Sequence, residues 1–424
     1  MNRQFQAIVV LGDGQTFSGT SLYAGDVDGG MKSLVFGGFA GSSVCEIGKL
    51  DASKVTGKIV LCEKGQVTDA AKGVAVDRAG GFGVIIASRS DLGEFASATA
   101  HLSTVPHAAG LEILRYMLKT PYPVGKILFF GTVLSSSPSA PRIGSFSGHG
   151  PNLAAPVEIV KPDLVAPGVS ILAAWSGLIS PTELSVDTRR VEFNVLSGTS
   201  MACPHVSGIA ALLKKARPNW SPAMIMSALT TTAYDKDSNG DAIKDMATGK
   251  AAGPFELGAG HVDPNSALDP GLVYDAGDDD YLDFMCELGY SDMKTRVGIF
   301  LRDGTVTKCS TRASTTAADL NRASFSVVVK AYGDNITLQR TVRNVGALVV
   351  YTVGGVPPPG TQLRVRPSEL VFDEEHQTRT YTVVIRTVSS GSFDKYTHGS
   401  IVWSDGVHRV KSPIAITWPS QSAA

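Results

Sequence analysis

The chain has 424 residues, of which 43% are hydrophobic and 18% are charged, and its formal net charge is −1. This length and composition predict a soluble globular protein of two to four domains with a substantial core. A near-zero net charge without a basic stripe argues against a nucleic-acid partner. The absence of a run of about 18 apolar residues argues against a membrane span.

The first part of the chain has strand-like and helix-like stretches in alternation. The glycines of L-G-D-G-Q at Leu11–Gln15 predict a hairpin turn. Strand-like runs follow at Lys58–Cys62 and Phe82–Ala87. Val67–Ala79 lies between them and is a helix candidate, and Thr104–Met117 predicts a turn that enters a second helix.

The chain contains five cysteines, which favours an oxidising compartment. Cys45 and Cys62 bracket one short segment and Cys286 and Cys309 bracket another, so each local pair is a candidate disulfide. A bridge across such a loop stabilises a fold by about 3 kcal/mol in the chain-entropy model. Connectivity cannot be read from sequence alone, and four unrelated buried thiols are the alternative. Cys203 is left over and is predicted to be a buried free thiol.

Residues 138–320 have the pattern of an α/β layer. Val169–Ala174 is strand-like, and Pro218–Ala233 predicts a helix with Ser221 as its N-cap and Pro222 as its first residue. Helices of this kind are expected to pack on a mostly parallel sheet.

The stretch Asn194–Gly208 reads N-V-L-S-G-T-S-M-A-C-P-H-V-S-G and places Ser200 after a small, turn-compatible lead-in. Apolar positions predict a helix from Ser200 to Lys214, with Pro204 in its first turn, where a missing N–H costs little. A serine at a helix N-terminus lies beside free backbone N–H groups that stabilise developing negative charge. Its hydroxyl still needs a base to take the proton.

The titratable groups near Ser200 in the sequence are poor candidates for that base. His205 lies five positions further on, roughly 140° around a helix, so its side chain is expected to point away. His149 stands in G-H-G, which only superficially mimics a catalytic histidine motif. Structural roles are also expected for the nearest polar neighbours, Asp163, Asp187 and Asn194.

From about Asn321 the pattern changes to short alternating runs separated by turns such as V-P-P-P-G at Val356–Gly360. Regular short strands with proline and glycine turns predict a β-sandwich.

The run G-T-S-M-A-C-P-H-V resembles the nucleophile segment of subtilisin-like serine proteases, with Ser200 at the reactive position. Four further stretches resemble plant subtilases: Arg3–Gly19, Ala140–Trp175, Pro218–Ala233 and Gly258–Asp275. Two departures stand out. Ser147–Asn152 reads S-G-H-G-P-N where the family has S-S-R-G-P-N, and Asn321–Ser324 reads N-R-A-S where the family has N-Y-P-S.

This resemblance implies a domain order. Residues 1–17 would be a remnant of the first half of the catalytic domain, and residues 18–137 an inserted, β-rich protease-associated domain. Residues 138–320 would be the C-terminal half of a subtilisin-like α/β catalytic domain, and residues 321–424 a fibronectin type III-like β-sandwich. Such inserts are linked to substrate access or to homodimer contacts, and a purely structural insert is the alternative. The resemblance implies no cofactor and no catalytic metal.

The resemblance also implies protein or peptide substrates and an extracellular location for the full-length protein, although the N-terminal sequence has no secretion signal. Asn335-Ile-Thr is then a glycosylation acceptor. Asn219-Trp-Ser is a poorer one, because Pro222 follows it and Trp220 is expected to be packed.

In complete family members the catalytic Asp, the catalytic His and the oxyanion Asn all precede the segment that matches Arg3–Gly19. We therefore expect a serine endopeptidase that forms an acyl-enzyme on Ser200, but expect these 424 residues alone to be inactive. A fragment or truncated gene model with exposed apolar surface is the favoured explanation. The alternative is a non-catalytic binding protein built from the protease-associated and fibronectin-like domains.

Overall fold

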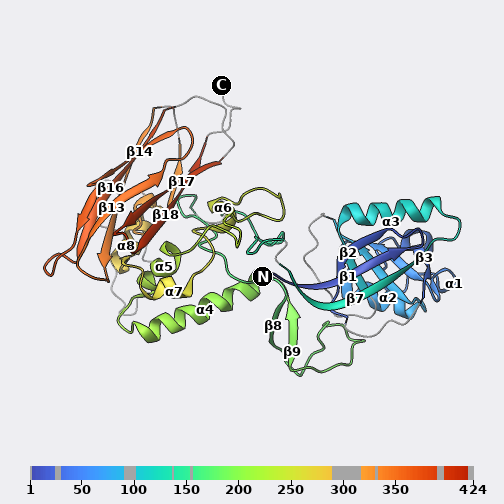
Figure 1. Ribbon diagram of the computed structural model, residues 1–424. Helices are drawn as coiled ribbons and strands as arrows, with labels where there is room; N and C mark the ends of the chain where they lie inside the picture. The colour runs from blue at the N-terminus through green and yellow to red at the C-terminus, as the bar shows by residue number, and fades with distance from the viewer. Residues whose placement is uncertain are drawn as a thin grey trace. The chain divides into compact units, whose positions relative to one another are not determined.

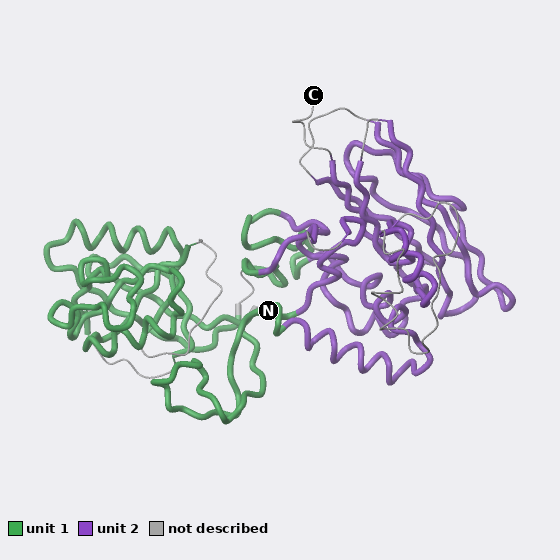
Figure 2. Tube along the Cα trace, turned by 180° about the vertical axis from the view of Figure 1, so that it is seen from behind, with its two compact units in different colours: residues 1–146, 167–201, 237–250 green, residues 147–166, 202–236, 251–424 purple. Residues whose placement is uncertain are grey.

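The computed structural model describes residues 2–23, 30–89, 102–135, 138–152, 156–288, 317–329, 333–388 and 396–418. The chain forms two compact units (Figure 2). Unit 1 contains residues 1–146, 167–201 and 237–250, and unit 2 contains residues 147–166, 202–236 and 251–424. Among the described helices, none combines the length and the hydropathy that a bilayer-spanning segment needs.

Unit 1 is built on a closed barrel (Figure 1), with strand order β1-β2-β6-β5-β4-β3-β7. The pairs from β3 to β6 are parallel, whereas β1, β2 and β7 pair antiparallel with their neighbours. The strands are β1 Asn2–Leu11, β2 Thr16–Thr20, β3 Lys32–Phe36, β4 Ile59–Glu63, β5 Gly83–Ala87, β6 Leu102–Val105 and β7 Val124–Ser135.

Helices α2 and α3 pack on opposite faces of β4. Alternate residues of a strand point to opposite sides. Leu61 therefore lies in a core with α3 (His107–Lys119), and Val60 lies in a core with α2 (Asp69–Arg78). The Thr68 side chain caps α2 by accepting from the Ala71 N–H. These elements confirm the helices and strands predicted for this region; the short helices are η1 Gly37–Ala40 and α1 Ala52–Val55.

The N-terminal strand is part of the barrel. The Leu11 N–H donates to the Gln15 carbonyl at 2.9 Å and the Gly14 N–H to the Leu11 carbonyl at 3.0 Å, which forms the predicted hairpin turn. Gly14 has φ 88°, a left-handed conformation that favours glycine. The boundary predicted at residue 17 falls inside β2, and β1 and β2 are both strands of the barrel.

Cys45 and Cys62 form a disulfide in unit 1, with a Cα–Cα distance of 5.7 Å, which confirms the predicted pair. Both side chains are fully buried in the core that contains α2. The other predicted pair, Cys286 with Cys309, falls partly outside the described residues, because Cys309 is not among them.

Beyond the barrel, unit 1 contains an antiparallel ribbon of β8 (Ile171–Ala174) and β9 (Phe193–Leu196). A mostly parallel sheet is predicted for residues 138–320. In the described part of that range, the parallel pairings are two isolated bridges, which occur in addition to the antiparallel ribbon. The bridges join Ile143 to Asp245 in unit 1 and Val165 to His261 in unit 2.

Helix α4 (Thr199–Ala216) runs from unit 1 into unit 2, and α5 (Pro222–Thr231) follows it. Ser221 caps α5 by accepting from the Met224 N–H at 3.0 Å, and Pro222 is its first residue, as predicted. Leu213 of α4 and Ala228 of α5 lie in one buried cluster. The remaining helical elements of unit 2 are α6 Pro254–Leu257, α7 Pro264–Leu268, α8 Asp278–Glu287 and η2 Ala317–Asp319.

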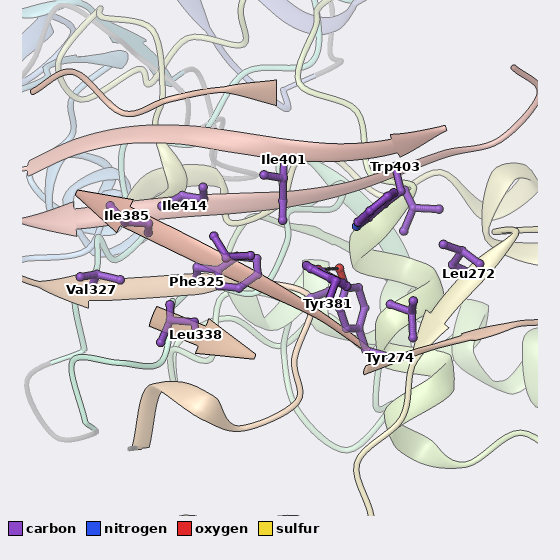
Figure 3. Close-up of a cluster of buried hydrophobic side chains, with 14 of the residues drawn as sticks. Leu272, Tyr274, Phe325, Val327, Leu338, Tyr381, Ile385, Ile401, Trp403 and Ile414 are labelled. Carbon is purple, nitrogen blue, oxygen red and sulfur yellow. Dashed lines mark hydrogen bonds between the residues drawn. The ribbon is translucent and has the colours of Figure 1, made fainter. Parts of the chain in front are cut away.

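Unit 2 also contains the predicted β-sandwich. One sheet has the order β10-β12-β16-β14 and the other β11-β18-β17-β13-β15, and their inward side chains form one core (Figure 3). The strands are β10 Leu272–Tyr274, β11 Phe325–Val328, β12 Asn335–Asn344, β13 Val350–Val356, β14 Thr361–Arg366, β15 Glu369–Val371, β16 Thr378–Thr387, β17 Tyr396–Ser404 and β18 Arg409–Thr417.

Strand β10 comes from the segment before the predicted sandwich and forms one edge of its first sheet. It pairs antiparallel with β12, with Tyr274 opposite Val342. The Tyr274 hydroxyl lies 2.6 Å from that of Tyr381 and 2.8 Å from the Ser412 hydroxyl, within the sandwich core (Figure 3). The sandwich is therefore completed by a strand that the local pattern did not assign to it.

Candidate active site

Ser200 lies where a strand, a tight turn and a helix meet in unit 1. Strand β9 ends at Leu196, and Ser200 is the second residue of α4. Two hydrogen bonds hold the turn: the Ser170 N–H donates to the Ser197 hydroxyl at 2.8 Å, and the Gly198 N–H to the Gly168 carbonyl at 2.8 Å. Ser200 is exposed to solvent. Ser200 is thus exposed at the start of the helix, next to a turn that two hydrogen bonds hold in place.

The start of α4 favours negative charge close to Ser200. The first N–H groups of a helix have no partner further back in the helix, and the macrodipole places partial positive charge at this end. An oxyanion that forms at this position is stabilised by donors already in place.

Pro204 differs from its predicted position. The helix begins at Thr199, so Pro204 is its sixth residue and lies in the second turn, beyond the first-turn position where proline is tolerated without loss. In a regular helix the N–H at this position would donate to the carbonyl four residues earlier, which is that of Ser200. Proline has no such N–H, so the helix itself leaves the Ser200 carbonyl without this bond.

Cys203 is exposed, so the prediction of a buried thiol is wrong. In α4 only Leu213 is buried, and Leu212 beside it is 69% exposed. The apolar periodicity of the sequence correctly predicts a helix, but periodicity does not show which parts of its apolar surface are covered.

The structure does not bring a histidine base to Ser200 within one unit. Ser200 belongs to unit 1, whereas His149 and His205 belong to unit 2. Of the histidines in the described part of unit 1, only His107 is present; it begins α3 of the barrel, and its Nδ1 lies 3.1 Å from the Ser88 carbonyl oxygen.

Asp187 is engaged by its own loop. Its carboxylate accepts from Arg189 Nε at 2.9 Å and from Thr182 Oγ1 at 2.8 Å. The hydrogen bonds from Arg189 hold the pKa of Asp187 well below its usual range, despite partial burial. This is the chemistry of a structural ion pair and not of a carboxylate that orients a histidine.

Asn194 is buried, and both ends of its side-chain amide are used locally. Its Nδ2 donates to the Pro181 carbonyl at 3.0 Å, and its Oδ1 accepts from the Val195 N–H at 2.8 Å. The amide therefore fastens the loop between β8 and β9.

Asp163 forms ion pairs with Lys161 and Arg322 in unit 2. The Arg322 guanidinium also lies 3.7 Å from the Met226 sulfur. Arg322 is part of N-R-A-S, one of the two departures in the sequence, and its contact with Asp163 was not predicted because the two residues are 159 positions apart. A cavity of about 30 Å³ beside this pair is the size of a water site rather than a substrate site.

In the described ranges, no cluster of three or more His, Cys, Asp or Glu side chains has the geometry to hold a metal ion.

Two protein-family models match parts of this chain. A family model described as "Subtilase family" matches residues 67–260, and one described as "Fibronectin type-III domain" matches residues 319–416. The first match extends from the start of α2 in the barrel through the Ser200 turn to the segment after α6. The second coincides with β11 to β18 and omits β10.

Three proteins of Arabidopsis thaliana are similar over nearly the whole chain. Subtilisin-like protease SBT1.4 is 48% identical over 99% of this chain and 55% of its own length. Subtilisin-like protease SBT1.7 is 44% identical over 99% of this chain and 56% of its own. Subtilisin-like protease SBT1.6 is 43% identical over 98% of this chain and 56% of its own.

Among solved structures, the aminopeptidase from Aneurinibacillus sp. strain AM-1 aligns with 32% of this chain and 33% of its own at 15% identity, with a TM-score of 0.25, which is too low to inform the fold. The chain spans about half the length of the curated relatives it matches. The two family matches and the identity to the Arabidopsis proteases show that this chain belongs to the subtilase family of serine proteases.

Proposed function

We propose that Ser200 is the nucleophile of a subtilisin-type endopeptidase that hydrolyses protein or peptide substrates. The observation that carries the proposal is the exposure of Ser200 at the start of α4, next to a turn held by hydrogen bonds. In this reaction Ser200 Oγ bonds to the carbonyl carbon of the substrate while its proton passes to a base. The C–N bond then breaks, the base protonates the leaving amine, and water hydrolyses the acyl-enzyme.

These 424 residues alone are not expected to turn over substrate. The only described histidine of unit 1, which contains Ser200, is His107 of the barrel, and the Asn194 amide is engaged within its own loop. In subtilisin itself, where the effect was measured, removal of the histidine costs about a millionfold in kcat. The exposed apolar side chains close to the nucleophile segment support a need for a complementary polypeptide. Leu172 and Phe193 in the β8–β9 ribbon are each 60% exposed.

The barrel is proposed to be a protease-associated module with a role in substrate access or homodimer contact. Its mixed strands with α2 and α3 fit the β-rich insert with flanking helices that the sequence predicts. We also propose that the full-length protein is extracellular, in keeping with the Cys45–Cys62 disulfide.

In an extracellular protein, Asn335 is the better glycosylation acceptor, because it is exposed at the start of β12. The other acceptor motif, Asn219-Trp-Ser, is less accessible to glycosylation. Trp220 is 7% exposed, and the Ser221 hydroxyl caps α5 and lies 2.5 Å from an Asp275 carboxylate oxygen.

The proposal is tested with a fluorophosphonate serine-hydrolase probe and peptide mapping by mass spectrometry. We expect no peptide turnover, but slow labelling of Ser200 that exceeds labelling of Ser207, an exposed serine in the same helix. The N–H groups at the start of α4 still favour negative charge at Ser200, which is the reason for expecting this preference. Ser200→Ala is the control for the labelled site.

Rapid labelling that Ser200→Ala abolishes would show that a base is available within the chain, and the expectation of inactivity would be wrong; His149→Ala would then be the next variant. Equal labelling of Ser200 and Ser207 in a folded protein would remove the support for Ser200 as the nucleophile. The non-catalytic binding protein would then be the better assignment.

A further inference from the structure

In the four-stranded sheet of the sandwich, the outer face of β12, β16 and β14 is exposed or half-buried, whereas Val273 of β10 on the same face is buried against α5. Burial alternates along β12, β14 and β16, so every second residue points away from the core. The outward residues are Asn335, Thr337, Gln339, Thr341 and Arg343 on β12, Thr378, Thr380, Thr382, Val384 and Arg386 on β16, and Gln362, Arg364 and Arg366 on β14. We call this surface the outer sheet face.

The outer sheet face is basic although the chain as a whole is nearly neutral. Four of its thirteen residues are arginines and none is acidic, whereas the chain has 38 Lys and Arg against 39 Asp and Glu. The structure records no ion pair between these arginines and any described carboxylate. Their positive charge is therefore not neutralised by neighbours among the described residues.

Strand register brings three of these arginines together. Gln362 lies opposite Arg386, and Arg364 lies opposite Val384, so Arg364 and Arg386 are diagonal neighbours. Diagonal neighbours are roughly 7–8 Å apart, within reach of long side chains. Arg366 follows Arg364 on the same side of β14, about 7 Å further along the strand. The result is a compact arginine cluster flanked by threonine and glutamine.

The composition of the outer sheet face argues against several classes of binding partner. Protein interfaces are anchored by buried aromatic and aliphatic side chains, but Val384 is the only apolar residue of this set. Single-stranded nucleic acid needs aromatic side chains for base stacking, and the set contains none. Insertion into a membrane surface needs an apolar face that enters the lipid, which is also lacking. What remains is a hydrophilic polyanion.

We propose that the outer sheet face binds a linear polysaccharide that carries carboxylates, such as a polyuronate. The guanidinium groups of Arg364, Arg366 and Arg386 match carboxylates in planar, two-point hydrogen bonds. The hydroxyl and amide groups of Thr337, Thr382 and Gln362 are suited to the sugar hydroxyls between them. This proposal is independent of the chemistry at Ser200.

Protection of a sheet edge is the competing explanation. Charged residues on an edge strand prevent edge-to-edge pairing between molecules, and β14 is the edge of its sheet. This accounts for Arg364 and Arg366. It does not account for Arg386, because β16 is paired on both sides, with β12 and β14.

The experiment measures binding of the complete chain to polygalacturonate, with its methyl ester and anionic phospholipid vesicles as comparison ligands. The triple variant R364Q/R366Q/R386Q is compared with R78Q/K215Q/K236Q, which removes the same charge from exposed sites elsewhere. We expect the first variant to weaken binding by about tenfold or more, the second to bind as the parent does, and the methyl ester to bind poorly. Circular dichroism and melting confirm that both variants fold.

Equal loss in both variants would show that only net charge matters and would overturn the proposal, as would binding to vesicles without binding to polygalacturonate. Binding is also compared before and after glycosidase treatment, because Asn335 lies opposite Arg386. Binding that occurs only after deglycosylation would mean that a glycan covers the face, and would overturn its role as a docking site. Binding in both states supports the proposal.

Discussion

His408 is held between two carboxylates in unit 2. Its Nδ1 lies 2.7 Å from Asp405, which follows β17, and its Nε2 lies 3.1 Å from Asp269, which follows α7. Burial opposes charge on the imidazole, but the hydrogen bond to Asp405 and the charge of Asp269 outweigh it, so the pKa of His408 is raised. Burial likewise opposes charge on Asp405, yet hydrogen bonds from His408 bring the pKa of Asp405 down to about 2.

These shifts predict how the stability of unit 2 depends on pH. The pKa of His408 is higher in the folded protein than in the unfolded chain. Its contribution to folding stability is therefore fully present below the unfolded pKa of about 6.5 and is lost as pH rises through the folded pKa. The contribution of Asp405 persists until pH falls toward 2. Thermal melts between pH 5 and 8 are therefore expected to show less loss of stability with rising pH in His408→Gln than in the parent. His376→Gln, which removes a more exposed Asp–His pair, is the matched control. Parallel pH curves for parent and His408→Gln would contradict this role.

At the scale of elements, β10 joins the protease segment to the sandwich. Tyr274 is 1% exposed, and its N–H donates to Ser227 of α5 at 2.8 Å while its hydroxyl contacts Tyr381 and Ser412 of the sandwich. Tyr381 in turn packs edge-on against Trp403, with ring centroids 5.2 Å apart. Burial raises the pKa of both tyrosines, so both hydroxyls stay neutral at physiological pH.

Tyr274→Phe keeps the ring but leaves the Tyr381 and Ser412 hydroxyls without their shared partner. A buried polar group that loses its hydrogen bond costs about 1–3 kcal/mol. We therefore expect the free energy of unfolding of unit 2 to fall by this amount, as measured by urea titration with tryptophan fluorescence. Tyr281→Phe alters a side chain that is 45% exposed and is expected to change stability by less than about 0.5 kcal/mol. Equal effects of the two substitutions would count against the buried network.

At the scale of the whole molecule, the two units have separate cores. The clusters around Leu61 and Val60 belong to unit 1, and the cluster around Trp403 belongs to unit 2. Separate cores predict separate unfolding transitions, since each unit buries its own apolar surface.

Removal of the Cys45–Cys62 disulfide tests whether the two units unfold in separate transitions. It closes a loop with a sequence separation of 17, for which the chain-entropy model gives about 3 kcal/mol. Calorimetry of Cys45→Ala/Cys62→Ala is expected to show a lower melting temperature for the unit 1 transition and an unchanged one for unit 2. A common shift of both transitions would show that the units unfold together.

Local signals in the sequence were sufficient for many elements. Ser221 and Pro222 predict the start of α5 because capping depends on neighbouring residues alone. The Cys45–Cys62 pair and the alternating strands of the sandwich were likewise predicted, and the structure confirms them. The identity of Ser200 as the reactive residue stays a prediction that the labelling experiment addresses.

The features that sequence reasoning missed depend on long-range pairing. β10 has only three residues, and nothing local assigns it to a sheet whose other strands begin more than sixty residues later. The arginines of the outer sheet face are spread between 343 and 386, and only strand register brings Arg364 and Arg386 together. The basic residues of this face therefore do not form a stripe in the sequence.

The membership of β10 sets a practical limit on how this protein can be divided. A C-terminal piece cut at the matched boundary, residues 319–416, would lack Leu272–Tyr274. The backbone of β12 that pairs with β10 would then become an open edge, and Tyr381 and Ser412 would face the gap left by Tyr274. A soluble, monomeric sandwich is therefore expected only from pieces that begin upstream of Leu272, so expression trials should place their start sites there.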